Sequence, residues 1–165
     1  MTDSLSVVPS QDKIKTGVKD PGPVAKALCD TVGDTHRLIF KTHAYHWNVE
    51  GPLFYSIHKL TEGQYEDMFE AIDVMAERVR ALGHLTPMSM QKLMENSVVE
   101  DLDKVPSARE MIEDLASDHE RVAHRMTAAI EISEDSRDPV TADLLTARSA
   151  FHEQAAWMLR ALAAD

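Results

Sequence analysis

The chain has 165 residues, of which 44% are hydrophobic and 27% charged, and its formal charge at pH 7 is −11. A chain of this length suits one domain and buries enough apolar surface to fold without covalent cross-links. Its acidic surface repels nucleic acids and anionic lipids and attracts cations, so metal ions are expected partners and polyanions are not.

The single cysteine, Cys29, excludes an internal disulfide and favours a reducing compartment. We expect a buried, inert thiol there. The N-terminus lacks the basic and then apolar run of a secretory signal, and no window approaches the roughly 18 apolar residues that span a membrane. We therefore expect a soluble, cytoplasmic protein that makes no contact with a membrane.

Residues 1–22 are polar, include two prolines and show no sustained hydrophobic period, which predicts a flexible N-terminal tail. Its three lysines are balanced by three aspartates. A tail of this kind is one route to DNA binding, but the charge balance does not support that use. The folded domain is predicted to comprise residues 23–165.

Two long helices are predicted after the tail. The first begins at Pro23, a residue favoured at the first helical position, and its apolar pattern stops at the Gly-Pro pair of residues 51–52. The second runs from about Phe54 to Leu82 and ends at Gly83, a favoured C-terminal cap.

A long connection, residues 84–106, follows, and its centre "SMQKLMENS" predicts a short extra helix. Ser107 and Glu110 fit a capping box at the start of the third long helix. The Asp-Pro pair of residues 138–139 opens the fourth. Four long helices with one long crossover predict an all-α, ferritin-like four-helix bundle.

One stripe of the second helix differs from the aliphatic stripe that would fill the bundle core. Five residues fall within about 100° of one another on this stripe: His58, Glu62, Phe69, Asp73 and Glu77. Phe69 and the nearby Tyr65 are rings that need cover. A second copy of the same helix would provide it, because a twofold dimer uses one patch against itself.

A single chain cannot gather these polar residues into one metal site. Glu62 and Asp73 are about 16 Å apart along the helix, and His58 and Asp73 about 22 Å. In two antiparallel copies, however, Glu62 lies opposite Asp73 and His58 opposite Glu77. His46, in the last turn of the first helix, comes back near His58 if the chain turns at the Gly-Pro pair.

Imidazoles and carboxylates together suit Fe(II), Mn(II) or Zn(II) better than calcium or magnesium, and iron is favoured where an open position admits an oxidant. Ligand softness alone does not choose among these metals. Taken singly, each of these residues also fits a solvated charge or a hydrogen-bonded histidine.

Four segments carry a close resemblance to the Dps family, the miniature ferritins: "HWNVEGPLF", "SIHKLTEGQYED", "AIDVMAERVRALG" and "DPVTADLLTARSAFHEQAAWML". They occur in this order within about residues 23–162. The resemblance implies a dodecameric shell of four-helix subunits that oxidises Fe(II), preferentially with hydrogen peroxide, and stores ferric mineral. It thereby implies iron homeostasis and protection from oxidative stress, without an organic cofactor.

The resemblance also implies a ferroxidase site at each twofold interface, with His46, His58 and Glu62 from one subunit and Asp73 and Glu77 from its partner. Many members carry aspartate at the position of Glu62, so direct and water-mediated ligation both stay open there. Further matches are Trp47, the tryptophan near the site that intercepts oxidising equivalents or simply packs at the interface, and Asp138 and Asp143, candidates for acidic threefold pores.

The remaining histidines have no place in this pattern. His43 lies one turn before His46 and is either a supporting residue or, as we favour, a satisfied surface histidine. Four others are predicted to be structural: His84, His119, His124 and His152. For Asp138, a simple helix N-cap is the alternative to a pore.

Two other functions are alternatives. The first is DNA compaction, which some family members perform with basic tails, but the C-terminus here ends "LRALAAD" and has no basic extension. The second is an inert bundle or a ferritin whose site lies inside one subunit. That site expects Glu-x-x-His pairs on core faces, and the sequence contains none.

Overall fold

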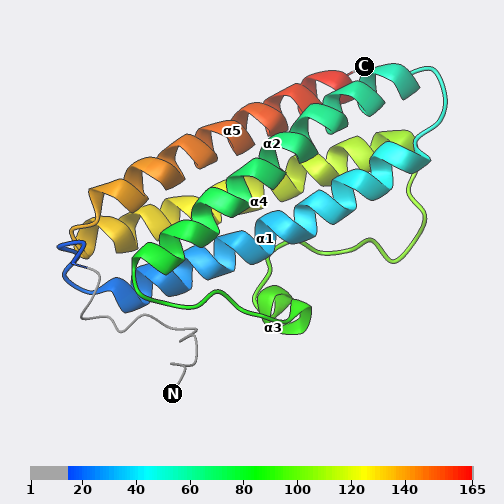
Figure 1. The fold of residues 1–165 in the computed structure, drawn as a ribbon. Coiled ribbons are helices and arrows are strands. Elements are labelled where there is room, and N and C mark those ends of the chain that lie inside the picture. Colours follow the sequence, from blue (N-terminus) through cyan, green and yellow to red (C-terminus); the bar gives the residue numbers. More distant parts are fainter. Residues whose placement is uncertain (1–14, 165) are drawn as a thin grey trace.

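The structure is a computed structural model that describes residues 15–164. It confirms the predicted all-α four-helix bundle, and the described residues contain no strand. Four long helices run along the bundle and a short one lies outside it (Figure 1): α1 (Pro21–Asn48), α2 (Phe54–Ala81), α3 (Met90–Met94), α4 (Ala108–Asp135) and α5 (Pro139–Ala163).

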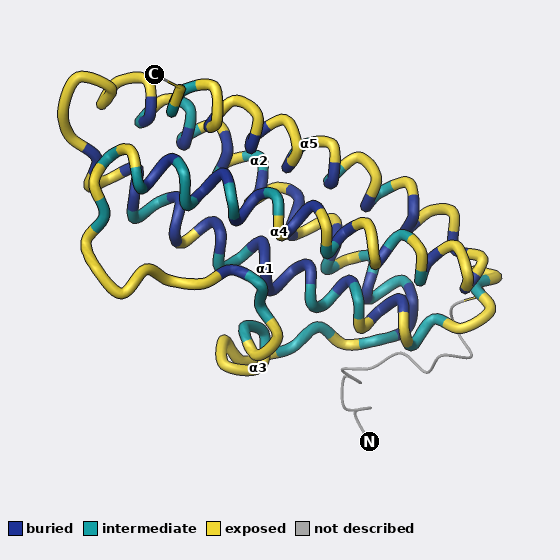
Figure 2. Tube along the Cα trace, turned by 180° about the vertical axis from the view of Figure 1, so that it is seen from behind, coloured by how far each residue is buried: buried dark blue, intermediate teal, exposed yellow. Residues whose placement is uncertain are grey.

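The bundle consists of two hairpins, α1 with α2 and α4 with α5, joined by the long crossover that contains α3 (Figure 1). Each long helix turns a buried face inward and an exposed face outward (Figure 2). The core between them is built mainly from aliphatic and methionine side chains, including Leu28, Leu38, Met68, Met75, Leu115 and Leu145.

Local signals in the sequence explain where most helices begin and end. The capping box at α4 is present, with the Ser107 hydroxyl accepting from the Glu110 N–H and the Glu110 side chain accepting from the Ser107 N–H. Gly83 follows α2 with a φ of +84°, a conformation that favours glycine. The predicted short helix forms as α3 within the crossover.

The start of the bundle lies earlier than predicted. Helix α1 begins at Pro21 rather than Pro23, because proline is suited to either position in the first turn. The chain just before it is attached: the Lys19 N–H donates to the Ser136 carbonyl at 2.9 Å, and Val18 packs against the core. The predicted flexible tail falls otherwise on residues 1–14, which lie outside the described residues.

Helix α3 is docked closely on α1. A Cβ atom added at Gly33 of α1 would lie 2.1 Å from the carbonyl oxygen of Leu93 in α3. Only glycine allows so close an approach of the two backbones. This position therefore holds the crossover against the bundle.

Cys29 is half-buried rather than buried as predicted, because it lies near the loop at Leu85, whose carbonyl is 3.9 Å from its Sγ. Burial raises the pKa of its thiol, which disfavours the reactive thiolate. Within residues 15–164, no helix is long and apolar enough to cross a membrane.

Candidate metal centre

The two histidines that flank the Gly-Pro break lie together, as the sequence predicted. Gly51 has a φ of +99° and turns the chain between α1 and α2. The rings of His46 and His58 then stack with centroids 3.7 Å apart and planes 18° from parallel. His46 is buried, with 7% of its surface exposed, and His58 is half-buried.

Hydrogen bonds select the same tautomer in both neutral rings. His46 Nδ1 lies 2.9 Å from the His58 carbonyl, and His58 Nδ1 lies 3.1 Å from the His46 carbonyl. A carbonyl oxygen only accepts, so Nδ1 is the donor in each ring. In the neutral imidazole this leaves Nε2 with a free lone pair, the state that binds a metal ion.

Glu62 follows one turn after His58 on α2. Its carboxylate is paired with Lys59, which lowers the pKa of Glu62, and the nearby His46 and His58 lower it further. The carboxylate is therefore ionised at neutral pH and lies near the two rings. His46 at the end of α1 therefore lies near His58 and Glu62 at the start of α2.

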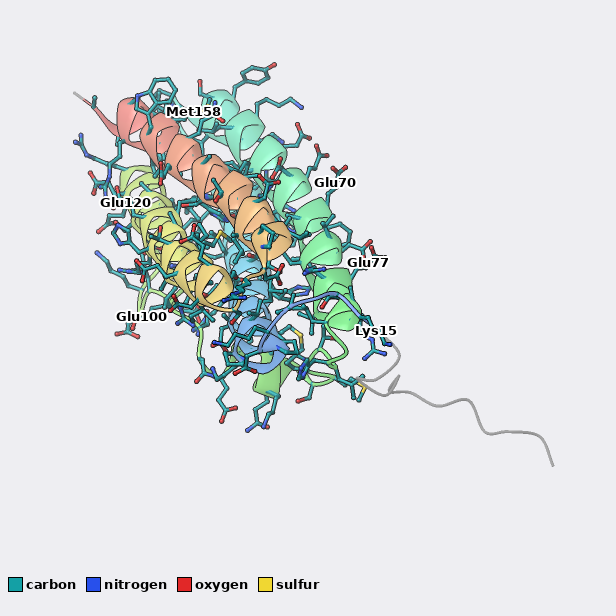
Figure 3. All side chains as sticks on the ribbon, turned by 90° about the vertical axis from the view of Figure 1, so that its left-hand side faces the viewer. Lys15, Glu70, Glu77, Glu100, Glu120 and Met158 are labelled. Carbon is teal, nitrogen blue, oxygen red and sulfur yellow. The ribbon has the colours of Figure 1, made fainter. Side chains whose placement is uncertain are left out.

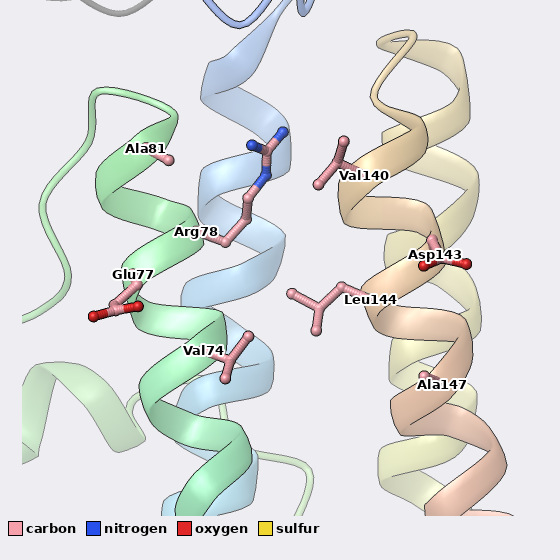
Figure 4. A pocket seen from close by; sticks show the side chains of 8 residues that line it. All are labelled: Val74, Glu77, Arg78, Ala81, Val140, Asp143, Leu144 and Ala147. Atoms are coloured by element: carbon pink, nitrogen blue, oxygen red, sulfur yellow. The ribbon is translucent and has the colours of Figure 1, made fainter.

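Asp73 and Glu77 lie further along α2 and do not join this end. Both are exposed, and Glu77 extends outward from the helix, on the side away from α5 (Figures 3 and 4). In one chain, the described residues contain no group of three or more His, Cys, Asp or Glu side chains that could hold a metal ion.

The surface between the two ends of α2 is apolar and uncovered. Phe69 is 68% exposed, and a groove of about 360 Å³ runs beside it, lined by His43, Tyr65 and Glu66 among others. Exposed aromatic rings of this size mark an interaction surface.

His43 and Trp47 are part of an aromatic cluster rather than isolated surface groups. The His43 ring stacks on Trp47 with centroids 5.0 Å apart and contacts Tyr65 at 3.8 Å. Tyr65 in turn meets the edge of His46 at 5.3 Å. Ring contacts thus connect His43 through Tyr65 to His46, and Trp47, which is 64% exposed, lies beside His43.

Two of the histidines predicted to be structural are paired with each other. His119 of α4 and His152 of α5 are both fully buried, with Nδ1 atoms 2.9 Å apart. Each occupies the apolar stripe of its helix, between Leu115 and Val122 in one case. The sequence could therefore indicate that each histidine is buried. It could not indicate that they pair, because they are 33 residues apart on different helices.

The prediction that Asp138 lines an acidic pore is wrong. It is fully buried, caps α5 by accepting from the Thr141 N–H at 3.0 Å, and pairs with Arg78 at 2.7 Å. The N-cap alternative is therefore correct. Asp143 is exposed and lines a groove between α2 and α5 together with Arg78 (Figure 4).

Comparison with known proteins places this geometry in a family. A model of the ferritin-like domain matches residues 25–165. An uncharacterised low temperature-induced protein of Nostoc is 40% identical over 83% of this chain and 78% of its own length. DNA protection during starvation protein 2 of Bacillus anthracis is 33% identical over 84% of this chain and 94% of its own.

Solved structures agree with these relatives. The crystal structure of Dps from Staphylococcus aureus superposes with a TM-score of 0.82, at 29% identity over 86% of this chain and 95% of that one. The structure of a Dps protein from Bacillus brevis gives 0.80, at 31% identity over 84% and 93%.

Proposed function

This chain belongs to the Dps family of ferritin-like proteins, and from that premise we propose that it is a ferroxidase that stores iron in a dodecameric shell. Fe(II) is the substrate, hydrogen peroxide the preferred oxidant, and ferric mineral the product. Removing both Fe(II) and peroxide protects the cell from oxidative stress.

The observation that carries the proposal is the pair of stacked imidazoles with both Nε2 lone pairs free. Their Nδ1 protons are held by each other's main-chain carbonyls, so neither ring can turn without losing a hydrogen bond. Glu62 supplies a negative charge beside them. Two nitrogen donors and carboxylates are a ligand set that Fe(II) accepts.

The second half of the site comes, in this proposal, from a partner chain across a twofold axis. An antiparallel partner would bring its Asp73 opposite Glu62 and its Glu77 opposite His58. The exposed rings of Tyr65 and Phe69 would be covered in the same contact. This arrangement accounts for a binding surface that one chain leaves both apolar and short of ligands.

The chemistry requires that electrons leave iron in pairs. Two Fe(II) ions each give one electron to one H₂O₂, whose O–O bond breaks to yield two hydroxide ions and two Fe(III). Because both electrons reach the same peroxide, no hydroxyl radical is released. The protein's part is to hold Fe(II) with a position open to the oxidant and to exclude other donors.

The experiment that tests this function compares wild type with His46→Ala/His58→Ala in the assembled protein. Fe(II) is added anaerobically, peroxide follows, and ferric iron is measured by absorbance. We expect the double variant to lose saturable Fe(II) binding and to oxidise iron only at the rate of free solution. The matched control, His124→Ala, changes an exposed histidine of α4 and should oxidise iron like wild type.

Unchanged iron oxidation in the double variant, at equal assembly by size-exclusion chromatography, would remove these histidines from the site. DNA compaction is the alternative function, and the formal charge of −11 argues against it.

A further inference from the structure

The core of the bundle contains a layer of polar side chains that the proposed iron site does not use. Four residues of α2, α4 and α5 form this polar layer in the interior: Gln64, His119, Arg148 and His152. Asp67 of α2, whose side chain is 44% exposed, completes the layer at its outer edge. Gln64 is 4% exposed, and both histidines are 0% exposed. Buried polar groups of this kind normally have hydrogen-bond partners.

Helix register places these residues at one level. Helices α2 and α5 run antiparallel (Figure 1), and Asp67 pairs with Arg148 at 2.6 Å while Arg78 pairs with Asp138. Because both helices rise by about 1.5 Å per residue, Gln64 lies level with residues 151–152 of α5. His152 in turn contacts His119 of α4.

The unpartnered atoms of the described residues gather in this layer. Once the atoms of ion pairs are set aside, five buried side-chain atoms lack a partner within the protein: Gln64 Oε1, Gln64 Nε2, His119 Nε2, His152 Nε2 and Arg148 Nε. At about 1–3 kcal/mol for each unsatisfied group, leaving all five without a partner would cost an amount comparable to the whole net stability of a domain. The polar layer therefore needs a bound molecule that forms hydrogen bonds with these groups.

The two histidines determine which hydrogen bonds the bound molecule must donate and accept. Their Nδ1 atoms share one hydrogen bond, so one ring donates and the other accepts. Each neutral ring carries a single proton. The donor ring therefore has a bare Nε2 that needs a donor, and the acceptor ring has an Nε2–H that needs an acceptor.

The charge balance of the polar layer argues against an ion as the bound species. Arg148 is paired with Asp67, which leaves the layer without net charge. A metal cation would meet the guanidinium of Arg148, and an anion has no proton to give to the bare Nε2 or to Gln64 Oε1. A small neutral molecule that both donates and accepts is required, and water is that molecule.

We infer that the polar layer is an internal binding site for a cluster of ordered water molecules, held by Gln64, His119 and His152. The site lies within one chain and does not depend on iron or on the twofold partner.

A crystal structure of the full assembled protein at about 1.5 Å resolution tests the inference directly. We expect water density within hydrogen-bonding distance of both unpaired Nε2 atoms and of the Gln64 amide. A dry layer, or density that refines as a metal or halide ion, overturns the inference.

A stability measurement gives an independent answer. Gln64→Met preserves the side-chain length and removes the amide. If the amide binds water that bridges to the histidines, its loss leaves other groups unpaired, and Tm should fall by about 3 °C or more. If the amide is a true orphan, Tm stays the same or rises, which would contradict the inference. Gln154→Met, at an exposed position of α5, is the matched control and should leave Tm unchanged.

Discussion

The buried histidine pair makes the bundle sensitive to acid, and the effect can be calculated. Burial lowers the pKa of His119 from 6.5 to about 3 and lowers that of His152 well below 6.5. Above pH 6.5 the histidines are neutral in both the folded and the unfolded chain, so they do not affect the pH dependence. Below pH 6.5 the two histidines bind protons in the unfolded chain but stay neutral in the folded chain, so the free energy of unfolding falls as the pH falls.

For His119 alone, a shift from 6.5 to about 3 lowers the free energy of unfolding by about 2 kcal/mol between pH 7 and pH 5. Burial also lowers the pKa of His152, so protonation of His152 in the unfolded chain adds to the loss in the same direction. Equilibrium denaturation at both pH values, at one fixed protomer concentration, measures the loss. The double variant His119→Leu/His152→Leu has no group to protonate there and should lose much less.

The comparison rests on the change with pH, because the double substitution also alters the absolute stability. His124→Leu, at an exposed position, should retain the full pH dependence of wild type. If wild type and the double variant lose equal stability between pH 7 and pH 5, the two histidines are not held neutral by burial, and the reasoning fails.

Four further predictions follow from the structure. Asp138→Ala removes the cap of α5 and the ion-pair partner of the largely buried Arg78. The free energy of unfolding, measured by denaturant titration, should fall by about 3 kcal/mol. The control Asp143→Ala, at an exposed site, should change it by less than about 0.5 kcal/mol. Gly33→Ala forces a Cβ into the backbone of α3 and should cost about 1–3 kcal/mol in the same assay, while unchanged stability would show that α3 is not docked there. Oxidation of Fe(II) by peroxide should quench tryptophan fluorescence, and Trp47→Phe should remove most of this quenching because Trp47 is adjacent to His46 and stacks on His43; equal quenching in the variant would contradict the assignment. In gel-shift assays we expect no binding to DNA at physiological salt, and saturable binding there would support DNA compaction instead.

Helix boundaries were predictable because local chemistry sets them. Ser107 and Glu110 form hydrogen bonds with free N–H groups at the start of α4, and Gly83 allows the chain to turn after α2. Each of these signals lies within a few residues of the helix end that it determines. The start of α1 was missed by two residues because prolines at 21 and 23 both suit a first turn, and only a distant contact to Ser136 distinguishes them.

Site chemistry was predictable only in part. The spacing of His46 and His58 around a Gly-Pro turn was enough to bring them together, but their exchange of Nδ1 hydrogen bonds with each other's carbonyls depends on how two helix ends meet. The pairing of His119 with His152 depends on the packing of α4 against α5, which no local pattern reports. Asp138 looked like a surface acid because its partner, Arg78, is 60 residues away.

The central claim is that one chain holds half of each metal site and its partner holds the other half. Subunit mixing tests it most directly. His58→Ala and Asp73→Ala subunits are dissociated, mixed in equal amounts and reassembled, and assembly is confirmed by native mass spectrometry. Each variant alone should be inactive in iron oxidation. Half of the twofold contacts in the mixture join unlike subunits, and each of these contains one intact site, so activity should return to about one quarter of wild type. Mixed assemblies that stay inactive, or a single variant that remains fully active, would contradict the claim.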